Sequence, residues 1–153
     1  MLQNYTVLKL LLKYYGLKEK AKGFDTIILN WVKSFFPKVK DDSEYSWCSI
    51  GLISILSENE EFRAQIKDAR IDPMARSWNR LPSIIYKLED ALPGDIIILT
   101  RGNGLSGHVG VFVGMDISNK NQINILGCNQ GDAVSIASFD KSRIIGIRRL
   151  IKN

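Results

Sequence analysis

A single histidine, His108, limits the acid/base chemistry that this chain can perform with an imidazole near neutral pH. It stands between Gly107 and Gly110, and glycines leave room for a substrate or another segment to approach. A neutral imidazole in such a place can take the proton of a thiol and return it to a leaving amine. His108 is therefore the candidate general base, and Gly107 a candidate substrate-binding residue. A histidine held by a backbone carbonyl at a strand edge is the alternative.

The candidate nucleophile is Cys48. Ser46 is a residue type that caps helices, and an apolar run follows over residues 50–56. This spacing predicts that the sulfur lies in the first helical turn, where unpaired backbone N–H groups and the helix dipole favour a thiolate. Tyr45 and Trp47 flank Cys48 and either line a substrate cleft or pack the helix onto the core. A buried structural cysteine is the alternative for Cys48 itself.

A catalytic histidine needs a partner that fixes its tautomer. Asn129 is the candidate, because it ends the strand expected after that of His108, and the end of one hairpin strand lies beside the start of the other. Gln130 and Asp132 are rival partners, and Asn129 as a plain turn residue is a further alternative. Since side chains alternate between the faces of a strand, Cys128 is expected to point away from Asn129 into the core.

The glycine-rich segment 102–107 fits the pattern G-x-G-x-x-G. A dinucleotide-binding turn requires a helix directly after this pattern, whereas residues 108–114 alternate like a strand. The segment is therefore predicted to be a flexible strand connection. Two cysteines and one histidine do not provide the usual zinc-ligand spacings, so neither a metal nor a cofactor is expected. A disulfide between Cys48 and Cys128 remains an alternative, and it would consume the candidate thiol.

The composition predicts one compact catalytic domain over residues 1–153. With 45% hydrophobic and 24% charged residues, the chain is long enough for one core and short for two. No apolar run reaches the length of a membrane span, and the apolar segment 8–12 lacks the cleavage site of a signal peptide. A monomer without a membrane partner, made in the cytoplasm, is expected.

The formal net charge of +5 is uneven, because lysines far outnumber acidic residues over residues 1–40. Such a charge is either a solvated surface or an attraction to a polyanion. No nucleic-acid-binding motif accompanies the lysines, so no nucleic-acid partner is expected.

The hydrophobic spacing changes near residue 92 from a helical half, about 1–90, to a strand-rich half, about 92–151. This order predicts an α+β fold in which N-terminal helices pack on a C-terminal antiparallel sheet of about five strands. Prolines and turn residues bound the elements. Helices are expected over 5–15, 25–36, 47–56, 60–67 and 74–80, and strands over 96–100, 108–114, 122–129, 134–137 and 144–150.

The ordered set of motifs resembles the papain-like cysteine hydrolases of bacterial cell walls, the NlpC-type and CHAP-type peptidases and amidases. No single piece is specific, but the ordered set is, and it covers roughly residues 15–150, nearly the whole chain. The motifs are Trp47-Cys48, Gly107-His108-Val109-Gly110 and Gly127-Cys128-Asn129-Gln130, with supporting matches at Ala75-Arg76-Ser77-Trp78, Pro93-Gly94-Asp95 and Gly146-Ile147-Arg148-Arg149.

The resemblance implies a papain-like fold and a catalytic triad. Cys48 would attack an amide carbonyl, His108 would carry the proton, and Asn129 would orient the ring, with Tyr45, Trp47, Gly107 and Gln130 binding substrate. The chain departs from typical NlpC-type enzymes in having Trp47 rather than aspartate before the nucleophile and no second histidine, so the CHAP-like variant fits better.

The function that this resemblance implies is peptidoglycan hydrolysis by an endopeptidase or amidase, in a phage lysin or an antibacterial effector. Peptidoglycan or a muropeptide is then the substrate, a cognate immunity protein a further partner, and the cell wall or periplasm the place of action after lysis or specialised secretion. The alternatives are a papain-like acyltransferase or deamidase acting on protein, a wall-binding module without activity, and a basic nucleic-acid-binding module.

Overall fold

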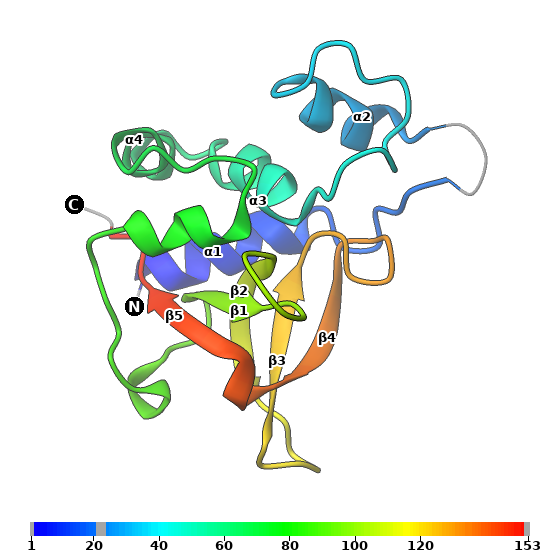
Figure 1. Cartoon of the computed structure of the whole chain (residues 1–153). Helices are drawn as coiled ribbons and strands as arrows, with labels where there is room; N and C mark the ends of the chain where they lie inside the picture. The colour runs from blue at the N-terminus through cyan, green and yellow to red at the C-terminus, as the bar shows by residue number, and fades with distance from the viewer. Residues whose placement is uncertain (1, 21–23, 152–153) are drawn as a thin grey trace.

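The computed structural model describes residues 2–20 and 24–151 and shows helices on one side of an antiparallel sheet (Figure 1). This confirms the predicted α+β class with five strands. The α-helices are α1 (Leu2–Leu12), α2 (Thr26–Lys33), α3 (Cys48–Leu56) and α4 (Glu60–Asp68), with short 3-10 helices η1 (Ala75–Arg80), η2 (Leu88–Asp90) and η3 (Lys141–Arg143). The strands are β1 (Ile96–Thr100), β2 (Gly107–Met115), β3 (Gln122–Gly127), β4 (Ser135–Asp140) and β5 (Ile144–Arg148).

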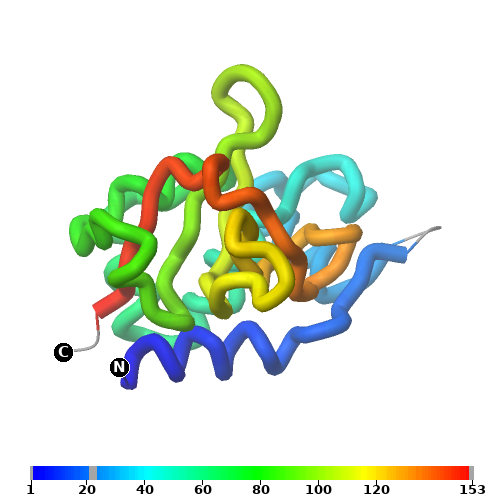
Figure 2. The backbone as a smooth tube through the Cα atoms, turned by 90° about the horizontal axis from the view of Figure 1, so that it is seen from below, coloured from blue at the N-terminus to red at the C-terminus, as the bar shows by residue number. Residues whose placement is uncertain are grey.

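The strands lie in the order β4-β3-β2-β1-β5, and every neighbouring pair is antiparallel. β1 to β4 therefore form an antiparallel meander, and β5 returns to the free edge of β1. Figure 2 shows that the β1–β2 connection, residues 101–106, projects from the rest of the chain. This agrees with the prediction of a strand connection for the glycine-rich segment, since no helix follows it.

A different cluster of apolar side chains lies on each face of the sheet. On one face, Ile98 and Val109 join the main core with α1, α2 and α3. On the other face, Leu99 and Phe112 belong to a second cluster, which partly buried residues such as Phe139 cover. Directly opposed residues of an antiparallel pair share a face, so His108, paired with Leu99, belongs to the second face.

Side chains cap the N-termini of α2 and α4, but no side chain caps α3. The Asp25 side chain accepts from the first backbone N–H groups of α2, and the Asn59 side chain does the same for α4. The predicted Ser46 cap of α3 is wrong, because Trp47 occupies the N-cap position and no side chain caps the helix. Burial of nearly every residue of α3 holds this helix instead.

A buried carboxylate joins both ends of the chain to the sheet. Asp95 is fully buried and accepts two hydrogen bonds of 2.7 Å from Arg149 and one of 2.9 Å from Asn4. Gly94 precedes it with φ of +101°, and a Cβ there would lie 2.5 Å from the Asn4 carbonyl oxygen. The turn before β1 therefore requires glycine, both for its backbone conformation and for the close approach of α1.

The boundaries between β3 and β4 differ from the predicted ones. β3 ends at Gly127 rather than at Asn129, because Asn129 has a left-handed φ of 56° that turns the chain out of the strand. β4 then begins at Ser135 and extends to Asp140.

Within the described residues, no helix has the length and apolar character to cross a membrane.

Candidate functional site

His108 is 1% exposed and is held by the side chain of Gln130. Its Nε2 lies 2.9 Å from Gln130 Oε1. The Gln130 amide nitrogen donates to the carbonyl oxygens of Ile125, at 3.0 Å, and Ser135, at 2.6 Å, which turns Oε1 towards the ring. An amide oxygen can only accept, so this network assigns the proton to Nε2 of His108. The unprotonated nitrogen is then Nδ1, which is buried and has no hydrogen-bond partner among the described residues.

The imidazole also stacks on an aromatic ring and lies near two arginines. Phe139 lies 5.2 Å from the His108 ring at an interplanar angle of 26°, and the Arg143 guanidinium lies 5.3 Å from the centre of the Phe139 ring. Burial lowers the pKa of His108 to about 4, against the opposing effect of the Gln130 hydrogen bond, and the charges of Arg101 and Arg143 lower it further. His108 is therefore neutral at pH 7, the state in which a ring nitrogen can accept a proton.

Cys48 is a free thiol at the first residue of α3, and it is 3% exposed. Its sulfur lies 3.8 Å from the Ser46 hydroxyl oxygen, which accepts a hydrogen bond of 3.4 Å from the side-chain nitrogen of Asn129. Cys128 is also free and fully buried, and burial and the charge of Cys48 raise its pKa. The disulfide alternative is therefore not formed, and Cys128 lies in the core as expected.

The structure divides the role expected of Asn129 between two adjacent residues. Asn129 is half-buried and contacts the Cys48 side of the turn through Ser46, whereas Gln130 contacts His108. The prediction rested on Asn129 ending the strand beside that of His108, and its left-handed conformation takes it out of that strand. In the described part of the chain, no hydrogen bond joins Cys48 to His108, and the turn carrying Asn129 and Gln130 links the two.

The residues expected to bind substrate differ in exposure. Tyr45 is 41% exposed and stacks on Phe36 with ring centres 3.9 Å apart, beside a hollow of about 390 Å³. Trp47 is fully buried, and its indole nitrogen donates to Glu19, so this side chain packs in the core and does not line a cleft. Gly107 is half-buried at the start of β2, where a Cβ would lie 2.9 Å from the Leu99 carbonyl oxygen.

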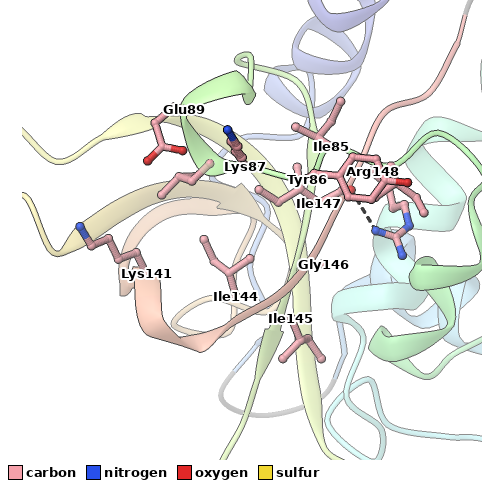
Figure 3. Close-up of a pocket in the computed structure, with 12 residues that line it drawn as sticks. Ile85, Tyr86, Lys87, Glu89, Lys141, Ile144, Ile145, Gly146, Ile147 and Arg148 are labelled. Carbon is pink, nitrogen blue, oxygen red and sulfur yellow. Dashed lines mark hydrogen bonds between the residues drawn. The ribbon is translucent and has the colours of Figure 1, made fainter.

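A larger hollow of about 640 Å³ lies along β5, away from the candidate catalytic residues. Figure 3 shows residues 85–89 on one side of it and Lys141 and residues 144–148 on the other. None of its lining residues was expected to act in catalysis.

Among the described residues, no group of three or more histidine, cysteine or acidic side chains is placed to hold a metal ion.

Comparison with known proteins shows a similarity to an RNA polymerase subunit. No protein-family model matches the chain. The DNA-directed RNA polymerase subunit Rpo5 of Sulfurisphaera tokodaii (strain DSM 16993 / JCM 10545 / NBRC 100140 / 7) is 41% identical over 58 residues, which are 38% of this chain and 68% of that subunit.

This similarity overturns the functional expectation drawn from the motifs. A polymerase subunit contradicts peptidoglycan hydrolysis as the function and peptidoglycan with an immunity protein as the partners. It also contradicts the expected absence of a nucleic-acid partner. The order of the motifs, on which the resemblance rested, therefore did not predict the substrate.

Proposed function

We propose that this chain is a cysteine hydrolase that cleaves an amide bond. By its similarity over 58 residues, the chain belongs to the family of DNA-directed RNA polymerase subunit Rpo5. The observation that carries the proposal is the state of His108: a buried, neutral ring whose proton is held on Nε2 and whose Nδ1 is bare. The free thiol of Cys48 begins α3 on the other side of the 127–131 turn. A papain-like fold, as the motifs suggest, is part of this proposal.

The reaction follows from these groups. Cys48 lies in the main core at the start of α3, whereas His108 lies on the second face of the sheet, so the two side chains must approach before Nδ1 of His108 takes the Cys48 proton and the sulfur attacks the amide carbonyl. The amine leaves with a proton from the imidazolium, and water then hydrolyses the thioester. Gln130 Oε1 continues to accept from Nε2–H throughout and so stabilises the charged ring. The first N–H groups of α3 have no acceptor within the helix and serve as oxyanion donors, each worth about 3 kcal/mol.

The direct test compares the two cysteines. The purified chain is assayed for fluorophore release from a mixed set of peptidyl coumarin amides, and its thiols are mapped by mass spectrometry after iodoacetamide. We expect alkylation at Cys48 to abolish release, Cys48→Ala to remove it, and Cys128→Ala to retain it. Release that survives in Cys48→Ala would refute the proposal.

The partner of the histidine is tested with a matched pair of variants. Gln130→Leu leaves Nε2–H without an acceptor and frees the tautomer, so we expect kcat to fall at least about tenfold. Asn129→Gly removes the bond to Ser46 and keeps the left-handed backbone conformation without strain, and it is expected to keep kcat within about twofold. An equal loss in both variants would count against the assigned role of Gln130.

A second candidate, a nucleic-acid-associated binding role, is favoured by the polymerase-subunit relative and the net charge of +5. If this role holds, affinity for a DNA duplex should fall steeply with salt, since phosphate contacts release counterions. Affinity that does not change between low and physiological salt would exclude it.

A further inference from the structure

The hollow of about 640 Å³ along β5 opens where a short segment leaves the edge of the sheet. Ile85 lies beside β5 on the side away from β1, and its N–H donates to the Ile147 carbonyl oxygen at 3.1 Å. Beyond Ile85, no bridge joins this segment to β5 in the described structure. Residues 86–89 and 144–146 then form opposite walls of the hollow (Figure 3). The hollow therefore begins where a strand pairing ends.

Backbone hydrogen-bonding groups are unused on both walls. Neither the N–H nor the carbonyl oxygen of Tyr86 has a hydrogen-bond partner among the described residues, and the same holds for the N–H of Lys87. The backbone of Lys87 is extended, with φ of −129° and ψ of 141°. On the other wall, β5 lies at an edge of the sheet, and no described strand covers the outer side of residues 144–146. Such an edge can pair with another extended chain.

The charged side chains of the lining are mostly positive. They are Lys87, Lys141 and Arg148 together with one acidic residue, Glu89. The ion pairs of the described chain involve none of these three cations, and Asp140, which is near Lys141, forms no ion pair with it. The Arg148 guanidinium donates to backbone carbonyl oxygens, whereas Lys87 and Lys141 are exposed and lie on opposite walls (Figure 3). Both lysines are therefore available to acidic groups of a partner.

Apolar side chains stand on the same walls. Ile84 is 40% exposed and Ile145 is 37% exposed. Leu88 and Ile144 are partly buried and pack against the second cluster. Since side chains alternate along an extended chain, such a chain can present apolar groups to these residues and acidic groups to the lysines.

We infer that this hollow binds an extended acidic peptide segment of a partner protein, which adds to the sheet along β5. Main-chain hydrogen bonds supply affinity in this mode of recognition, and side-chain contacts supply selectivity. A second copy of this chain is the less suitable occupant, because pairing two β5 strands would bring like charges together. The inference is independent of the proposed hydrolysis, since neither Cys48 nor His108 lines the hollow.

The probe is the peptide fluorescein-Val-Glu-Val-Glu-Val-amide, and its binding to the full chain is measured by fluorescence anisotropy. One control peptide has lysine in place of both glutamates, and the other carries N-methyl groups on its three central residues. We expect saturable binding of the acidic peptide and binding at least about tenfold weaker for each control. No binding of the acidic peptide would overturn the inference. Equal binding of the N-methylated peptide would indicate an amphipathic anion and overturn strand addition, and equal binding of the lysine peptide would overturn the acidic class.

Variants connect the binding to the hollow. Lys87→Glu and Lys141→Glu should each weaken binding of the acidic peptide about fivefold, whereas Lys33→Glu, the same change of charge on α2, should change it less than twofold. Ile145→Asp should weaken it at least about tenfold, and its control is Ile136→Asp, because Ile136 is 45% exposed on β4 at the opposite edge of the sheet. Equal losses in the hollow variants and their controls would overturn the inference.

The second copy is tested by sedimentation velocity of the unmodified chain over a range of concentrations. We expect a monomer at every concentration, with or without the acidic peptide. A dimer that the acidic peptide dissociates would show that β5 pairs with another copy, and it would overturn the assignment to a partner protein.

Discussion

Acidification from pH 7 to pH 5 is expected to destabilise the fold through His108 alone by about 2 kcal/mol. Burial holds the pKa of this histidine near 4, whereas a free imidazole has a value of 6.5. Between these two values the unfolded chain binds a proton that the folded chain does not, so the free energy of unfolding falls as the pH falls. The loss begins near pH 6.5 and approaches about 3 kcal/mol near pH 4.

The measurement is urea unfolding followed by tryptophan fluorescence at pH 7 and pH 5, for the unmodified chain and for His108→Gln. The variant has no imidazole, so the titration of other groups is common to both proteins. Glu19 is one such group, and burial raises its pKa, which opposes acid destabilisation in both. The unmodified chain should lose about 2 kcal/mol more than the variant over this interval.

An equal loss in the two proteins would refute the reasoning. It would mean that His108 either has an ordinary pKa in the folded state or is not buried as the structure shows. NMR titration of the imidazole gives an independent result, because the chain has one histidine. A midpoint near 6.5 in the folded protein would contradict burial as the dominant influence, whereas a midpoint near 4 is expected.

Two further predictions concern packing and a buried ion pair. Gly51→Ala should destabilise the fold by about 1–3 kcal/mol in urea unfolding, because the new Cβ would lie 2.7 Å from the Cys128 sulfur. The control is Gly114→Ala, which should cost much less because no atom lies within 4 Å of its new Cβ. Arg149→Met should cost about 3–5 kcal/mol by the same measurement, because it leaves the buried Asp95 carboxylate without its cation. A loss below about 1 kcal/mol would show that Asp95 is satisfied by its other partners.

The strands were predictable because their signals are local. β1 has the predicted bounds, Ile96–Thr100, since an apolar run of β-branched residues follows a Pro-Gly-Asp turn. The core position of Cys128 was predictable for the same reason, as alternation along β3 continues to this residue. The cap of α3 was not, because burial of the helix outweighs the contribution of one capping hydroxyl.

The partner of the histidine depended on a conformation that the sequence did not reveal. Asn129 and Gln130 both carry an amide, and either can accept a hydrogen bond from an imidazole. The left-handed φ of Asn129 turns its side chain towards Ser46 and brings Gln130 to His108. Asparagine adopts this conformation more readily than most residues, so its place at a strand end was the available signal.

The sequence by itself determined which residues are available for chemistry, one imidazole and two thiols, and which segments form strands and helices, because composition and periodicity are local properties. Only the tertiary structure decided the state of those residues. The pKa of His108 depends on its burial and on the charges of Arg101 in the hairpin connection and Arg143 in η3. Its tautomer depends on the two hydrogen bonds that Gln130 donates. Phe139 and Arg143 come from segments distant in sequence from His108, and the Gln130 bonds, although local, form only when the 125–135 segment takes its folded conformation.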